Sequence, residues 1–168
     1  LKTQAQEVVD ILASARIGAI AVLLNWRLAA PEIAWILGDC EPRVLLCADQ
    51  FADLAPRDPP FVVAGDAAIE TAAETVGPPV ADAAAPADAM HMIYTSGTTG
   101  KPKGCVHSHA TALGAARGFA ERRAVDAATR LFSTSPLFHV AGLQHLLAVL
   151  ACGGAVVVPE RGLSPADM

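Results

Sequence analysis

The residues best suited to chemistry lie in one short segment, 94–104. This segment, Y-T-S-G-T-T-G-K-P-K-G, holds four serine and threonine hydroxyls, three glycines and two lysines, and it contains no acidic residue. Glycine lets the backbone come close to a ligand, while free N–H groups, hydroxyls and ammonium groups attract anionic oxygens. A pair of opposite charges at about 4 Å is worth about 4 kcal/mol at an effective dielectric constant of ~20. The composition therefore favours a loop that binds a polyphosphate.

The segment follows neither of the common nucleotide-binding patterns. The pattern G-x-x-x-x-G-K-[ST] fails because Gly97 and Gly100 are too close together and Pro102 follows Lys101. The dinucleotide-binding pattern G-x-G-x-x-G does not occur in the chain. Composition alone also leaves a second interpretation open, because a solvated turn between two strands explains the glycine, threonine and proline equally well.

Taken with three further stretches, the segment resembles the phosphate-binding signature of the adenylate-forming (AMP-binding) superfamily, which includes acyl-CoA synthetases, adenylation domains and luciferases. The matching residues, T-S-G-T-T-G-K-P-K-G, span 95–104. Residues 18–28 with Pro31 and Glu32 resemble the family's "GA…V.LN.RL…E" segment, and 131–142 resemble the "PLFH..G" element of acyl-CoA synthetases. The step from Gly153-Gly154 into a valine-rich strand also agrees, so that the resemblance covers essentially the whole chain.

The resemblance implies a ligase reaction in two steps. A carboxylate attacks the α-phosphate of Mg-ATP to give an acyl-adenylate and pyrophosphate, and the thiol of coenzyme A then displaces AMP. The implied partners are therefore ATP, Mg²⁺, coenzyme A and a small carboxylic acid. The residues that the resemblance assigns to the phosphates are Thr95, Ser96, Gly97, Thr98, Thr99, Gly100, Lys101, Lys103 and Gly104.

Three of the matching positions carry individual roles in the family. Thr95 matches a loop hydroxyl that lies near the metal ion, and Lys103 matches the loop lysine that neutralises the developing pyrophosphate charge. Lys101 falls where the family is variable. His139, in the "PLFH" element, matches an aromatic residue or histidine that lies beside the acyl carboxylate. The resemblance therefore makes Lys103 and His139 the catalytic candidates. From the residues alone, a histidine that caps the helix beginning near Val140 is the favoured interpretation.

A second possible site follows the loop. Cys105, His107 and His109 alternate along a predicted strand, which would place the three side chains on one face. Cysteine and histidine suit zinc, but no second cluster lies nearby in the sequence, so the favoured interpretation is a scaffold strand.

These candidates are positioned by an α/β chain, in which we predict mostly parallel sheets with helices on both faces. Trp26 and Trp35 are interpreted as packing residues. The predicted helices cover 4–16, 31–37, a short turn from 49, 110–123 and 140–151; the predicted strands cover 19–24, 43–47, 61–63, 90–94, 105–108, 131–134 and 155–158. A proline- and alanine-rich surface connection is expected over 75–88.

Composition limits the possible classes of protein. Among the 168 residues, 53% are hydrophobic and 17% charged, which excludes a disordered chain. The net charge of −5 gives no reason to expect a nucleic-acid partner. The apolar run 140–158 is as long as a membrane span, but Gln144, His145 and the Gly153-Gly154 pair favour a buried helix, a turn and a strand. Four dispersed cysteines without a C-x-x-C pair indicate reduced thiols in a cytoplasmic protein.

The chain starts without Met inside a predicted helix and stops at Met168 where another helix begins. We therefore expect 1–168 to be a fragment of the large N-terminal AMP-binding domain of an acyl-CoA synthetase, without the small C-terminal domain and its catalytic lysine. Such a fragment is expected to be inactive alone. Two alternatives stay open: an amino- or aryl-acid adenylation domain, and a non-catalytic nucleotide-binding module.

Overall fold

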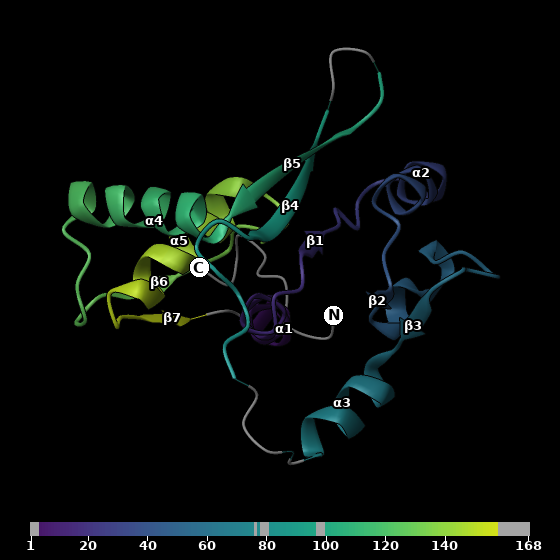
Figure 1. Ribbon diagram of the computed structural model, residues 1–168, viewed down its shortest axis with the longest axis horizontal. Coiled ribbons are helices and arrows are strands. Elements are labelled where there is room, and N and C mark those ends of the chain that lie inside the picture. Colours follow the sequence, from purple (N-terminus) through teal and green to yellow (C-terminus); the bar gives the residue numbers. More distant parts are fainter. Residues whose placement is uncertain (1–3, 76, 78–80, 97–99, 158–168) are drawn as a thin grey trace, which may run out of the picture.

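The computed structural model describes residues 4–75, 77, 81–96 and 100–157, and it has an α/β fold (Figure 1). Its helices are α1 (Gln4–Arg16), α2 (Ala30–Cys40), the 3-10 helix η1 (Asp49–Leu54), α3 (Asp66–Glu74), α4 (His109–Arg123) and α5 (Val140–Ala151). Its strands are β1 (Ala21–Leu23), β2 (Val44–Leu46), β3 (Val62–Ala64), β4 (Ala89–Thr95), β5 (Lys103–Ser108), β6 (Arg130–Phe132) and β7 (Ala155–Val157).

Among the described residues the strands form three small sheets, in the orders β1-β4-β5, β2-β3 and β6-β7. The pairs β1–β4, β2–β3 and β6–β7 are parallel, as predicted. The pair β4–β5 is antiparallel. A parallel pair needs a crossover of a dozen or more residues, and the connection 96–102 is too short for one. The two strands that flank the candidate loop therefore form a hairpin.

The hydrophobic core lies where α1, α4 and α5 meet the sheet that contains β4. Three alanines of α4 recur at intervals of four residues on one buried face: Ala112, Ala116 and Ala120. Such small side chains let α4 lie close against α5, which contributes buried leucines, Leu143 and Leu146 among them. Because β5 runs directly into α4 at His109, this packing fixes the inner end of the hairpin relative to α5.

The apolar run 140–158 forms a helix, a turn and a strand over its described part, as predicted. α5 ends at Ala151, residues 152–154 turn the chain, and β7 begins at Ala155. No helix in the described part of the chain is both long enough and apolar enough to cross a membrane.

The unit around β2 and β3 differs from the sequence-based expectation. Apolar strands are expected to be covered on both faces, but 52% of Val44 and 63% of Val62 are exposed. These two residues are paired in register, so they place exposed apolar surface on the same small sheet. The helix α3, which follows β3, was not predicted, although its alanine-rich sequence favours a helix.

Candidate functional site

The candidate loop connects the outer ends of β4 and β5. Thr95 pairs with Lys103 as the last residues of the ladder, and Tyr94 pairs with Gly104 one step further in. Figure 1 shows this end of the hairpin extending beyond α4 and α5. Thr95 and Lys103 are both exposed, and the Thr95 hydroxyl lies 3.9 Å from the sulfur of Cys105. The register therefore places the Thr95 and Lys103 side chains on one face of the hairpin at the start of the connection.

The other described residues of the loop are also open to solvent. Ser96, Gly100 and Lys101 are exposed, and Gly100 has a φ of +82°, a conformation that favours glycine. Three of the predicted phosphate ligands, Gly97, Thr98 and Thr99, lie outside the described residues. The exposure of this hairpin end fits both a ligand-binding loop and a solvated turn.

Gly104 has a packing role that the sequence did not indicate. A Cβ atom at this position would lie 2.6 Å from the Met92 sulfur and 3.2 Å from Cζ of Tyr94. A larger residue at position 104 would therefore have to displace the Met92 side chain and would press against the Tyr94 ring. The last glycine of the signature is therefore required for side-chain packing within the hairpin.

Sequence reasoning did not identify the contacts between α2 and the hairpin. Asp39 accepts a hydrogen bond of 2.6 Å from the Tyr94 hydroxyl, although the two residues are separated by 55 positions. The Trp35 ring meets Tyr94 edge-on, with ring centroids 6.3 Å apart, and the Lys101 nitrogen lies 5.9 Å from the Trp35 ring centre. The interpretation of Trp35 as a packing residue is confirmed. The spacing of Trp35 and Asp39 places them on one helix face, but nothing in the sequence indicates what that face contacts.

Burial raises the pKa of Tyr94 well above its usual value, and the hydrogen bond to Asp39 raises the pKa further. The phenol is therefore protonated at neutral pH and donates to the carboxylate. Such a bond to an ionised acceptor is stronger than one between neutral groups.

His139 is the N-cap residue of α5, and its side chain is exposed. Its Nδ1 accepts a hydrogen bond of 3.3 Å from the backbone N–H of Ala141. The capping role that the residues alone favoured is thus confirmed, whereas the role of His139 beside a substrate stays a prediction. With Nδ1 accepting, the neutral ring carries its proton on Nε2, which leaves Nε2 free to donate.

The turn that carries His139 is fixed from both sides. Leu137 is 2% exposed and belongs to the core. A Cβ at Gly142 would collide with the carbonyl oxygen of Pro136. The glycine of the "PLFH..G" element is therefore required by a close backbone approach.

No zinc site is found near Cys105, His107 and His109. In the described ranges, no group of three or more His, Cys, Asp or Glu side chains could hold a metal ion. His107 instead stacks on His91, with ring centroids 4.9 Å apart. Burial, followed by the charges of His107 and His109, lowers the pKa of His91 from 6.5 to about 4. His91 is therefore neutral at pH 7, and its side chain lies on the buried face of the hairpin.

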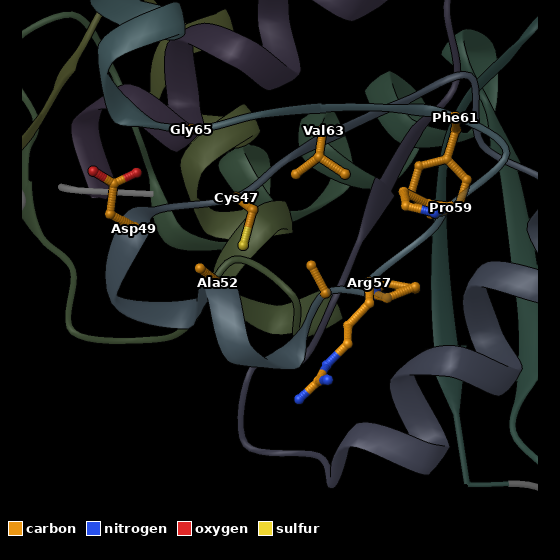
Figure 2. Close-up of a pocket in the computed structure, with 10 residues that line it drawn as sticks. Cys47, Asp49, Ala52, Arg57, Pro59, Phe61, Val63 and Gly65 are labelled. Atoms are coloured by element: carbon orange, nitrogen blue, oxygen red, sulfur yellow. The ribbon is translucent and has the colours of Figure 1, made fainter.

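One hollow of about 400 Å³ lies against the β2–β3 unit, away from the hairpin (Figure 2). None of the predicted site residues lines it. Its wall includes the thiol of Cys47, the Arg57 side chain and the ring of Phe61. This hollow is therefore separate from the predicted phosphate site.

The comparisons with known proteins show which family the chain belongs to. Residues 1–168 match the family of AMP-binding enzymes, and the chain belongs to that family. The resemblance stated from the sequence is confirmed, and so is the α/β fold class.

The similar proteins are CoA ligases. The chain is 35% identical, over 96% of its length and 34% of the relative, to a 3-hydroxybenzoate–CoA ligase of Aromatoleum sp. (strain CIB). It is 38% identical, over 80% of its length and 28% of the relative, to a long-chain-fatty-acid–CoA ligase of Mycobacterium tuberculosis. The chain thus spans about a third of the length of the curated relatives it matches.

A solved structure agrees with the fold. The O-succinylbenzoate coenzyme A synthetase of Bacillus subtilis, determined in complex with ATP and a magnesium ion, has a TM-score of 0.80 to this chain. The sequences are 26% identical, and the match covers 98% of this chain and 44% of that protein.

Proposed function

We propose that the complete polypeptide containing this chain is an AMP-forming acid–CoA ligase. A carboxylate oxygen attacks the α-phosphorus of ATP and pyrophosphate leaves; the sulfur of coenzyme A then attacks the acyl carbon, AMP leaves and the thiol proton is lost. The observation that carries this proposal is the exposed hairpin end with Thr95 opposite Lys103, in a chain whose relatives are CoA ligases.

The proposed phosphate site combines charge with small polar groups. The Lys103 ammonium neutralises the negative charge that develops on pyrophosphate as the leaving group departs. Ser96, Gly100, Lys101 and Gly104 contribute backbone and side-chain donors, together with residues 97–99, which enter through the family signature.

Magnesium fits the chemistry of this site. The Thr95 hydroxyl is an exposed oxygen donor, the kind of ligand that Mg²⁺ accepts, and Mg²⁺ takes most of its remaining ligands from phosphates and water. When bound, the ion supplies charge neutralisation on the phosphate oxygens. Thr95 would hold it from the β4 side of the loop.

His139 is proposed to lie beside the carboxylate of the acid. Its Nδ1 is engaged by the helix cap, which fixes the ring, and its exposed Nε2–H is free to donate toward a substrate oxygen. The anchored turn around Leu137 and Gly142 keeps this donor in place.

We further propose that 1–168 forms part of the large N-terminal domain, and that a small C-terminal domain lies elsewhere in the complete polypeptide. The share of the relatives that the chain covers supports this division. A cytoplasmic location is proposed because Cys40, Cys47, Cys105 and Cys152 are all free thiols, as expected in a reducing compartment.

Fatty acids, the substrates named for the mycobacterial relative, are one candidate substrate class. The second class is aryl acids. It is favoured by the 35% identity to a 3-hydroxybenzoate–CoA ligase over nearly the whole chain. Fatty and aryl acids are therefore the two classes to compare.

The test is ATP–pyrophosphate exchange by the complete polypeptide with a panel of fatty and aryl acids. Exchange is expected with at least one acid, and Lys103→Ala should lower it about 100-fold, the typical cost of removing one preorganised stabilising group. Arg122→Ala, at an exposed end of α4, is the matched control and should exchange like the unmodified protein. The absence of exchange with every acid, together with no ATP binding by calorimetry, would contradict the proposal.

A further inference from the structure

The helix α2 contacts the hairpin at two places, one before the candidate loop and one within it. On the β4 side, the Trp35 ring meets the Tyr94 ring at 87°, with centroids 6.3 Å apart. Within the loop, the Lys101 nitrogen lies 5.9 Å from the centre of the same Trp35 ring. One indole therefore contacts the residue before Thr95 and a lysine within the loop.

Asp39 adds a polar contact one helical turn after Trp35. Residues four positions apart share a face of a helix, and this face is turned toward the hairpin. The Asp39 carboxylate accepts the 2.6 Å hydrogen bond from the Tyr94 hydroxyl. Tyr94 is thus held by an aromatic contact and a hydrogen bond from the same helix.

The Tyr94 ring has little freedom to move away from α2. Across the ladder it lies over Gly104, where a Cβ would come within 3.2 Å of it. The half-buried ring therefore lies between α2 and β5. Thr95 and Lys103 are the next pair along the same two strands, so their placement depends on how Tyr94 is held.

The contact with Lys101 has a different effect. A lysine side chain has many rotamers, and fixing it at a binding site costs conformational entropy. The face of an indole attracts an ammonium group and holds it within reach of the loop. The positive charge of Lys101 is therefore located before any anion arrives.

We infer that Trp35 and Asp39 are positioning residues for the proposed phosphate site, acting through Tyr94 before the loop and Lys101 within it. This inference rests on the proposed function. Neither residue needs to touch the nucleotide, so their loss weakens ATP binding more than it slows the chemical step.

The test is a double-mutant cycle on the complete polypeptide, with KM for ATP and kcat measured by pyrophosphate exchange. Trp35→Leu and Lys101→Met should each raise KM about three- to tenfold, the range of a cation–π contact, with kcat changed less. The double variant should raise KM by less than the product of the two single effects, because both changes remove the same contact.

Trp26 provides the matched control, since it is the other tryptophan of the chain and stacks on Phe51 instead. Trp26→Leu should leave KM unchanged, and its combination with Lys101→Met should give the effect of Lys101→Met alone. Trp35→Phe keeps an aromatic face for the ammonium group and should restore most of the ATP affinity. If Trp35→Leu does not fold, judged by circular dichroism, Lys101→Met and Asp39→Ala carry the test. Asp39→Ala removes the acceptor of the Tyr94 hydroxyl and should raise KM as Trp35→Leu is expected to.

The outcomes distinguish this inference from the proposed function. Exchange by the unmodified protein combined with independent, fully multiplicative effects of Trp35→Leu and Lys101→Met would overturn the inference alone. An unchanged KM in both Asp39→Ala and Lys101→Met would do the same. No exchange and no ATP binding by the unmodified protein would overturn both.

Discussion

The outer and inner ends of the β4–β5 hairpin are built from the same two strands, but their surroundings are opposite. At the outer end, Thr95 and Lys103 face solvent. At the inner end, His91 is 4% exposed and stacks on His107 against the helical core. Both ends carry residue types that suit chemistry. The comparison teaches that burial decides which of them is available to a ligand, because the His91 side chain is closed to solvent whereas those of Thr95 and Lys103 are open to it.

The largest effect on stability is expected at the inner end, upon acidification. The pKa of His91 is about 4 in the folded protein and 6.5 without burial, so the unfolded chain takes up its proton at a higher pH. Stability therefore falls as the pH decreases from about 6.5 toward 4 and is fully present above this window. We expect His91 to account for a loss of about 2 kcal/mol between pH 7 and pH 4.5, less than full conversion of the shift because pH 4.5 lies above the pKa of the folded state.

The measurement is urea unfolding of the complete polypeptide at pH 7 and pH 4.5, with His91→Phe as the comparison. Phenylalanine keeps a ring against His107 but cannot be protonated. Because the carboxylates titrate equally in both proteins, the difference between the two pH dependences isolates His91. Equal losses of stability in the two proteins would show that His91 is not the group responsible.

A smaller effect is expected between the two ends, at Gly104. In Gly104→Ala the added methyl group meets the flexible Met92 side chain and the Tyr94 ring, which Asp39 holds in place. We expect a loss of about 1 kcal/mol in the free energy of unfolding, at the low end of overpacking costs because Met92 can move.

The control for this substitution is Gly114→Ala in α4, where a Cβ meets nothing within 4 Å. That variant should be more stable by about 0.5–1 kcal/mol, since alanine has a higher helix propensity than glycine. Thermal and urea unfolding measure both changes. A Gly104→Ala protein as stable as Gly114→Ala would contradict the close packing of Tyr94 on β5.

The comparison of the two ends also shows what the sequence could predict. Local patterns sufficed for α1, whose bounds Gln4–Arg16 match the prediction, and for the strands on either side of the loop. The signature 95–104 identified the candidate loop because its residue types are close in sequence. The helix α3 was missed because its nine residues are fewer than the roughly 11–18 over which a helical period is recognised.

Contacts between distant segments could not be predicted. The pairing of Tyr94 with Asp39 and the stacking of His91 on His107 depend on register and on helix placement, which no local pattern encodes. The predicted alternation of Cys105, His107 and His109 along one strand is confirmed for Cys105 and His107 on β5, but it is wrong for His109, which begins α4. Without His91 in view, the same alternation suggested a metal site.

The smallest effect on stability is expected at the outer end, at Thr95. Thr95→Val keeps the shape of the side chain and removes an exposed hydroxyl whose described partner is the Cys105 sulfur at 3.9 Å. The free energy of unfolding should change by less than about 0.5 kcal/mol, as for most surface substitutions. Pyrophosphate exchange, in contrast, should fall about tenfold or more because a ligand of the leaving phosphates is lost.

Thr95→Ser, which restores the hydroxyl, should recover most of the activity, and Cys105→Ser should leave it unchanged. Equal exchange by Thr95→Val and Thr95→Ser would mean that the outer end of the hairpin contributes no hydroxyl to the reaction, and the contrast between its two ends would then be one of burial alone.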